Sequence, residues 1–107
     1  MLDRLPSGHS VFVDTNIFLY HFLDLRPSCT EFLTRVRRGE VRAYTSAIVL
    51  SEATHHLMLS EIGEQRAVTP GGALRLLRRH PDVISGLSKT PELIRQLPRW
   101  RIRILPL

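Results

Sequence analysis

Cysteine, lysine and long apolar runs are scarce in this sequence, and each scarcity narrows what the chain can be. Cys29 is the only cysteine, so no internal disulfide can form and a reducing compartment is expected. No apolar run approaches the roughly 20 residues that a membrane-spanning helix needs. The first residues include Asp3, Arg4 and Pro6, which is unlike the apolar stretch of a signal peptide. We therefore expect a cytoplasmic protein with no membrane partner.

Lysine occurs once, at Lys89, so arginine supplies almost all of the positive charge. The formal net charge is +5 and the pI is about 10.6. A basic domain suits a polyanionic partner, because each cation near a phosphate releases condensed counterions, and arginine binds phosphate bidentately. Mild basicity also occurs in proteins without such a ligand. Nucleic-acid contact is therefore one of two interpretations of the charge.

Several catalytic signatures are missing as well. The sequence contains no Ser-His-Asp arrangement, no phosphate-binding glycine loop and no zinc-ribbon cysteine pair. His55 and His56 are adjacent, whereas the zincin pattern places two histidines four residues apart. His56 follows Glu52 by four residues, so a Glu–His metal pair stays open beside the alternative of a surface histidine.

The 107 residues fit a single domain, residues 1–107, without a linker or an internal repeat. Hydrophobic residues, at 43%, are numerous enough for a packed core. Strands are predicted at 10–13, 42–45 and 101–105, helices at 17–23, 28–38, 47–62, 73–80 and 90–97, and a helical or irregular segment at 83–87. The resulting order, β-α-α-β-α-α-α-β, predicts an α/β fold with a parallel sheet of about three strands flanked by helices.

Local signals predict where these helices begin and end. Ser28, with Glu31 three residues later, forms a capping-box pattern at the start of the second helix. Ser46 is expected to cap the third helix and Gly63 to end it. Residues 69–72, Thr-Pro-Gly-Gly, are expected to interrupt helical structure.

Two acidic residues follow the first two predicted strands. Asp14 comes directly after the first strand, and Glu52 lies about two turns into the helix that follows the second strand. If the two strands are neighbours, both carboxylates lie at the same edge of the sheet and can converge on Mg²⁺ or Mn²⁺. Alternatively, Asp14 only caps a helix and Glu52 is a solvated helix residue.

Three segments resemble the PIN-domain family, especially VapC-type toxins. Residues 11–20 are similar to the family's opening strand, its acidic residue and its first helix, and read VFVDTNIFLY. Residues 44–52 resemble the second strand, its Thr-Ser turn and the helix bearing a Glu, and read YTSAIVLSE. Residues 103–107, RILPL, look like the third strand and the turn after it. The interval of 38 positions between Asp14 and Glu52 is also similar to the family's spacing.

The resemblance implies a three-layer fold and a metal-dependent endoribonuclease of the toxin–antitoxin type. Asp14 and Glu52 would hold Mg²⁺ or Mn²⁺, which activates water and stabilises charge on the scissile phosphate. The supporting hydroxyl and amide groups would come from Thr15, Asn16 and Ser46. RNA would be the substrate and a cognate antitoxin protein the partner. The basic residues Arg37, Arg38 and Arg42 either contact substrate phosphates or form a solvated arginine face.

The sequence departs from the family's pattern after the third strand. The resemblance implies a site of three or four acidic residues, and the later ones follow the third strand in the family. We therefore expect a carboxy-terminally truncated domain that lacks the last helix–strand units of the family. Truncation would weaken or abolish activity and leave residues 11–13 as an unpaired apolar edge, which favours a homodimer or a strand-exchanged oligomer. A non-catalytic module that binds RNA or protein is the alternative.

Overall fold

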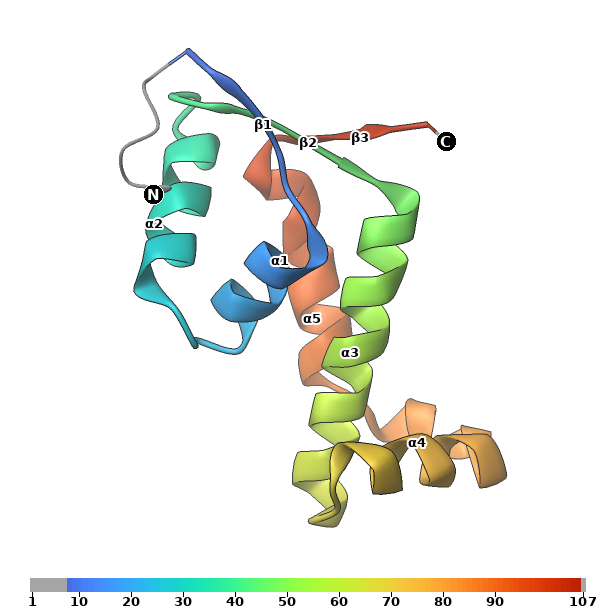
Figure 1. Ribbon diagram of the computed structural model, residues 1–107. Coiled ribbons are helices and arrows are strands. Elements are labelled where there is room, and N and C mark those ends of the chain that lie inside the picture. The colour runs from blue at the N-terminus through green and yellow to red at the C-terminus, as the bar shows by residue number, and fades with distance from the viewer. Residues whose placement is uncertain (1–7, 107) are drawn as a thin grey trace.

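A computed structural model describes residues 8–106, which form a three-stranded sheet and a set of helices (Figure 1). The predicted α/β class with a short parallel sheet flanked by helices is confirmed. The strands are β1 (Ser10–Phe12), β2 (Arg42–Ser46) and β3 (Ile102–Leu105). The α-helices are α1 (Thr15–Phe22), α2 (Pro27–Arg37), α3 (Ala47–Arg66), α4 (Pro70–Arg79) and α5 (Lys89–Gln96), with 3₁₀ helices η2 (Pro81–Gly86) and η3 (Leu97–Trp100).

The sheet has the order β1-β2-β3, and both pairs of strands are parallel. Each connection therefore moves one strand further in the same direction. Because parallel crossovers are almost always right-handed, two such connections place their helices on the same face of the sheet. Figure 1 shows this arrangement, with the helices on one side of the strands. The described residues thus form the sheet and one layer of helices.

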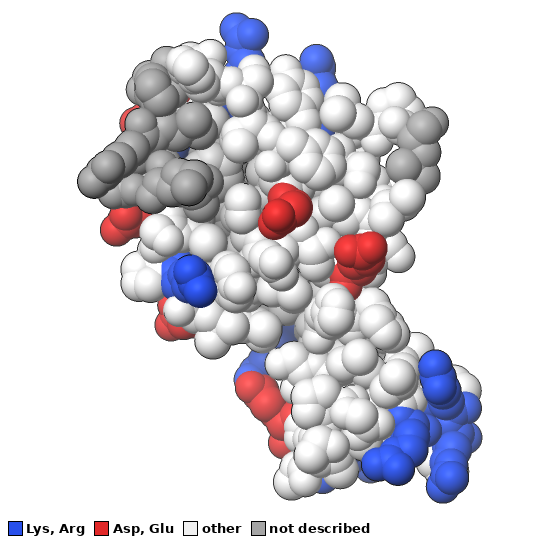
Figure 2. All heavy atoms as spheres, in the orientation of Figure 1, with Lys and Arg blue, Asp and Glu red and all other residues white. Residues whose placement is uncertain are grey.

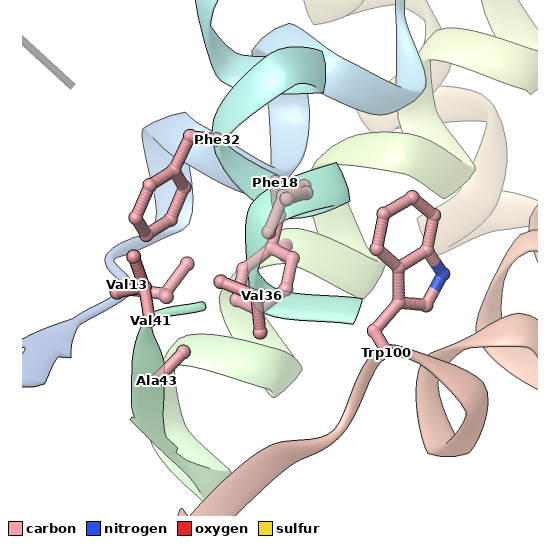
Figure 3. Close-up of a cluster of buried hydrophobic side chains, with 9 residues drawn as sticks. Val13, Phe18, Phe32, Val36, Val41, Ala43 and Trp100 are labelled. Atoms are coloured by element: carbon pink, nitrogen blue, oxygen red, sulfur yellow. The ribbon is translucent and has the colours of Figure 1, made fainter. Parts of the chain in front are cut away.

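The main core lies between this layer and the sheet (Figure 3). Val13 and Ala43 project from the sheet side, Phe18 comes from α1, Phe32 from α2 and Trp100 from the end of η3. All five are less than a tenth exposed. Alternation along β2 explains the arrangement, since Ala43 faces this core while its neighbours in the strand face away. Cys29 is buried near the start of α2.

The opposite face of the sheet carries no helix in the described part of the chain. Phe12, Arg42, Tyr44 and Arg103 belong to this face by alternation, and none of them joins a buried cluster. Phe12 is 49% exposed, which is unusual because all-parallel sheets are generally covered on both faces. We call this surface the helix-free face.

A second, smaller core lies at the far end of α3, where α4 and η2 pack against it. Ile62, Ala73 and Val83 form its centre. Long α3 therefore joins two packed regions, and in Figure 1 it runs from the sheet to α4. No helix in residues 8–106 is long and apolar enough to cross a membrane.

A buried carboxylate fastens the start of α5 to α3. Glu61 is 4% exposed, and its two oxygens accept hydrogen bonds from the backbone N–H groups of Ser88 (2.7 Å), Lys89 (3.0 Å) and Thr90 (2.7 Å). Burial opposes the ionisation of Glu61, but the three backbone donors outweigh it and lower its pKa to about 2. The carboxylate thus supplies the N-terminal cap that α5 lacks from its own residues.

Several predicted helix ends are wrong by a few residues. Arg26, not Ser28, is the N-cap of α2, because Pro27 occupies the first helical position. Its side chain makes no capping bond, because a guanidinium group has no acceptor for a backbone N–H. Helix α3 runs past Gly63 and ends before Ala67, which adopts the left-handed conformation (φ 53°, ψ 46°). Residues 69–72 start α4 instead of interrupting a helix, because the Thr69 hydroxyl caps Gly72 and Pro70 suits the first turn.

Candidate metal site at the carboxyl edge of the sheet

Asp14 lies where β1 ends and α1 begins. It is the N-cap of α1, with extended backbone angles (φ −92°, ψ 177°), and its Oδ1 accepts a hydrogen bond from the Ile17 N–H at 3.3 Å. One interpretation of Asp14, helix capping, is thereby confirmed. The capping bond uses a single oxygen of an exposed carboxylate, so Oδ2 and solvent-facing lone pairs stay available to a ligand.

Glu52 lies in the second turn of α3, and its side chain reaches across to α1. The Thr15 hydroxyl donates a hydrogen bond of 2.9 Å to Glu52 Oε2. Thr15 is the residue after Asp14, so this contact brings Glu52 to the start of α1, next to Asp14. Glu52 is exposed and its Oε1 accepts no hydrogen bond from residues 8–106. Strands β1 and β2 are neighbours, so the condition under which both acidic residues lie at the same edge of the sheet is met.

Thr45 holds the ends of β1 and β2 in register, a role that the sequence analysis missed. Its fully buried hydroxyl donates to the Val13 carbonyl at 2.9 Å, and the Val13 N–H donates to the Tyr44 carbonyl at 2.7 Å. Both the N–H and the carbonyl group of Val13, the residue before Asp14, are thus hydrogen-bonded to residues of β2. The available signal was alternation, which places Thr45 on the same buried face as Ala43.

The supporting residues fall into two groups. Thr15 and Ser46 lie at the starts of α1 and α3, and Ser46 Oγ accepts from the Val49 N–H at 3.2 Å as the predicted cap. Asn16 is exposed in the first turn of α1. The side chains of Thr15 and Ser46 are partly buried, and each hydroxyl group makes one of these hydrogen bonds, Thr15 to Glu52 and Ser46 to Val49. These bonds orient the starts of the two helices.

The three predicted substrate arginines lie in different settings. The Arg37 guanidinium stacks over the Trp100 ring, 4.9 Å from its centroid, which is a packing contact. Arg38 is the C-cap of α2. Arg42 begins β2 and is exposed on the helix-free face. The structure therefore does not bring the three side chains together around Asp14 and Glu52.

The donor set at this edge fits a hydrated divalent cation. Within residues 8–106, no three His, Cys, Asp or Glu side chains group closely enough to hold a metal ion. His55 and His56 are exposed, with ring centroids 6.1 Å apart, and join no such group. Mg²⁺ commonly keeps several waters and binds through one or two carboxylates. Asp14 and Glu52 offer that number of oxygen ligands in a position open to solvent.

Comparison with known proteins adds one finding. The PIN domain family model matches residues 11–100, which include Asp14 and Glu52 and stop before β3. No curated protein and no solved structure matches the chain. A PIN domain generally implies a nuclease, and typically one that depends on a divalent metal. Because the match covers most of the sequence, the chain belongs to the PIN domain family.

Proposed function

We propose that this protein is a metal-dependent endoribonuclease of the VapC-like, toxin–antitoxin type, acting in the cytoplasm. The observation that carries the proposal is the hydrogen bond from Thr15 to Glu52, which brings the acidic residue of α3 to the start of α1 beside Asp14. Asp14 and Glu52 would ligate Mg²⁺ or Mn²⁺, and Thr15, Asn16 and Ser46 would form the shell around them.

The bound cation would supply Lewis acidity, lowering the pKa of a water and neutralising charge on the scissile phosphate. The protein's own groups would do the positioning. Thr15 holds Oε2 of Glu52, so the carboxylate cannot rotate freely, and its orientation costs little entropy when a ligand binds. Asp14 is fixed in the same way by the Ile17 N–H. Two immobilised carboxylates are better ligands than two flexible ones.

RNA cleavage by the purified chain tests this proposal. We expect cleavage of a single-stranded RNA in Mg²⁺ or Mn²⁺ and none in EDTA. Asp14→Asn and Glu52→Gln should each lower the rate by at least about a hundredfold, since removing one stabilising ligand costs several kcal/mol of barrier. Both substitutions are conservative, because Asn also caps helices and Gln retains a carbonyl oxygen for Thr15.

Two surface substitutions provide matched controls. Asp82 and Glu92 are exposed and lie in η2 and α5, away from the sheet edge. Asp82→Asn and Glu92→Gln remove the same charges without touching the site, so they should leave the rate unchanged. Cleavage that persists in Asp14→Asn, or that falls equally in Asp82→Asn, would contradict the assigned site.

The alternative is a non-catalytic PIN-like module that binds RNA or protein. The observation in its favour is the number of acidic residues, since the part of the chain that the structure describes places only a pair at the sheet edge. Thermal unfolding with Mn²⁺ separates the two functions, because a ligand that binds the folded state raises Tm. A chain with the proposed site should gain stability with Mn²⁺, and Asp14→Asn should not.

We also propose two protein partners, a cognate antitoxin and a second copy of the chain. Strand β1 pairs only with β2 in the described residues, so its outer edge presents free backbone donors and acceptors. Such an edge favours pairing with another chain, as a homodimer or by strand exchange. Phe12 lies in this strand and is 49% exposed, which adds apolar surface beside the edge.

A further inference from the structure

Three arginine side chains line one hollow of about 410 Å³ at the amino-terminal end of β2 and β3. They are Arg42 in β2, Arg101 directly before β3, and Arg103 in β3. We call this feature the arginine hollow. It lies at the opposite end of the parallel strands from Asp14, so it is separate from the candidate metal site.

Within residues 8–106, no acidic side chain lines the arginine hollow. Among the described residues, none of its three guanidinium groups has an ion pair or a side-chain hydrogen bond, whereas Arg95 pairs with Glu92. Like charges that share a concave surface repel one another, and an anion between them relieves that repulsion. Arginine is well suited to this ligand, because its planar fork of donors matches the oxygens of a phosphate.

The backbone of Arg101 supports a specific role for its side chain. Arg101 adopts the left-handed conformation (φ 58°, ψ 28°), which costs an L residue about 1–2 kcal/mol and which glycine or asparagine adopts more easily. Gly39, with φ 78°, forms the facing wall. A Cβ on Gly39 would lie 3.3 Å from Arg101 Nη1, so the guanidinium lies against bare backbone. The strained turn places a charged group over this wall.

Aromatic rings lie beside the arginines on the helix-free face. Tyr44 lines the arginine hollow and pairs across the sheet with Arg103 on one side and Phe12 on the other. Phe12 and Arg103 are exposed, and Tyr44 is half-buried. Nucleic-acid bases stack on aromatic rings and on guanidinium planes, and single strands are bound by such rows combined with positive charge.

We propose that the arginine hollow binds backbone phosphates of a single-stranded RNA, whose bases stack on Tyr44 and Phe12. Arg42 and Ser46 are four residues apart in β2, about 13 Å at the rise of a strand. A short length of RNA therefore spans the distance from the hollow to the sheet edge at Asp14. Only this last relationship rests on the proposed nuclease function, because phosphate binding by arginine needs no metal.

A second group of arginines provides a control for charge alone. Arg75, Arg78 and Arg79 lie in α4 and are exposed. In Figure 2 basic side chains gather at the end of the molecule that α4 occupies, while acidic ones are scattered over the face shown. Among the described residues, the pocket that Arg75 and Arg79 border is lined by His80 but by no Phe, Tyr or Trp. These residues match the arginine hollow in number and charge but not in surroundings.

The test is fluorescence anisotropy with a labelled oligouridine RNA in EDTA, which prevents cleavage. One triple variant combines Arg42→Gln, Arg101→Asn and Arg103→Gln, where Asn keeps the left-handed conformation accessible. The control combines Arg75→Gln, Arg78→Gln and Arg79→Gln. The first should weaken binding by at least about tenfold and reduce the salt slope by about 2, while the control changes affinity less than about twofold.

Three outcomes would overturn the proposal. Equal losses in the two triple variants would show unspecific charge attraction. Competition by inorganic phosphate at the same concentration as oligouridine would show a site for a free anion. Competition by polyglutamate but not by RNA would show an acidic polypeptide as the ligand. Circular dichroism confirms that each variant is folded, and Tyr44→Leu, which keeps every charge, should weaken oligouridine binding alone.

The test separates this proposal from the proposed nuclease activity. Asp14→Asn should bind oligouridine as the natural sequence does in EDTA, although it should not cleave RNA. Loss of cleavage with unchanged binding would therefore test only the assignment of Asp14 and Glu52 to the metal site. Loss of binding in the arginine variant would test only the assignment of the arginine hollow as the RNA-binding site.

Discussion

The Thr15 hydroxyl and the Glu52 carboxylate, 37 residues apart in sequence, are joined by a hydrogen bond of 2.9 Å. This bond links the first turn of α1 to the second turn of α3, so the two helices that follow neighbouring strands are held together at the sheet edge. It also brings Glu52 to the residue that follows Asp14, and no ion pair within residues 8–106 occupies either carboxylate. The geometry of the candidate metal site depends on this contact.

Thr15→Val should therefore lower Mn²⁺ affinity by about tenfold, as loss of a group that orients a metal ligand typically does. Thr15→Ser, which keeps the hydroxyl, should not. Stability should fall by no more than about 1 kcal/mol, because one exposed hydrogen bond is lost. Isothermal titration with Mn²⁺ measures the affinity, and urea unfolding measures the stability.

Thr54 provides the matched control for this experiment. Its hydroxyl also lies on α3 but donates to the Leu50 carbonyl of the same helix at 2.7 Å. Thr54→Val removes a hydroxyl from α3 without touching a carboxylate, so Mn²⁺ affinity should be unchanged. If Thr15→Val behaves like Thr54→Val, Thr15 does not orient Glu52.

The buried Glu61 should make stability depend on pH in acid. Its pKa is about 2 in the folded protein, below its ordinary value of 4.5, so its contribution is complete above pH 4.5 and is lost as the pH falls towards 2. This difference corresponds to about 3 kcal/mol as an order of magnitude. Glu61→Gln should be less stable than the natural sequence at pH 7, and the gap should close between pH 4.5 and 2.

Denaturant unfolding of both proteins across this pH range measures the gap. Glu64 gives the comparison, because it lies one turn further along α3 and is exposed in its ion pair with Lys89. Glu64→Gln should change stability by less than about 1 kcal/mol at any of these pH values. A gap for Glu61→Gln that stays constant down to pH 2 would show that its charge does not stabilise α5.

Glycine at the end of α3 should stabilise the protein. Ala67 is the C-cap and adopts φ 53°, a conformation that costs an L residue about 1–2 kcal/mol and that glycine adopts freely. Ala67→Gly should therefore raise stability by up to about 1 kcal/mol, after the greater flexibility of the unfolded glycine is subtracted. Ala73→Gly, in the buried interior of α4, should lower it. Thermal unfolding should show opposite signs for the two substitutions.

Proline in β1 should prevent the proposed self-association through the sheet edge. The Val13 N–H points to β2 and donates to the Tyr44 carbonyl, so alternation directs the Phe12 N–H outward. Phe12→Pro removes that outward donor while leaving the pairing with β2 intact. Sedimentation should show self-association weakened by at least about tenfold relative to Phe12→Thr, which keeps the N–H. Equal association of the two variants would place the interface elsewhere.

Much of the site was predictable because its signals are local. The strand that ends at Asp14 is indicated by the apolar run directly before it. The helix start at Ser46 is indicated by the helical pattern directly after it. Glu61 was missed because its partners are 27 to 29 residues away. The available signal was its place four residues after Leu57 on the buried stripe of α3, where an acidic residue demands a partner.

The arginine hollow shows a second limit of sequence analysis. Arg42 was considered with Arg37 and Arg38 because they are close in sequence, yet the strand register places it near Arg103 instead. The pairing of β2 with β3 is a long-range event that no local pattern specifies. The predicted end of α3 at Gly63 failed for a different reason, since packing of α3 against α4 and η2 extends the helix beyond a residue that favours termination.

The most direct measurement is nuclear magnetic resonance of the backbone amides during a titration with Mn²⁺, which broadens signals near a bound ion. We expect selective broadening at Thr15, Asn16 and Ser46 at low Mn²⁺, and no such broadening in Asp14→Asn. Broadening centred on Asp82 or Glu92, or the same broadening in Asp14→Asn, would contradict the claim that Asp14 and Glu52 form the metal site.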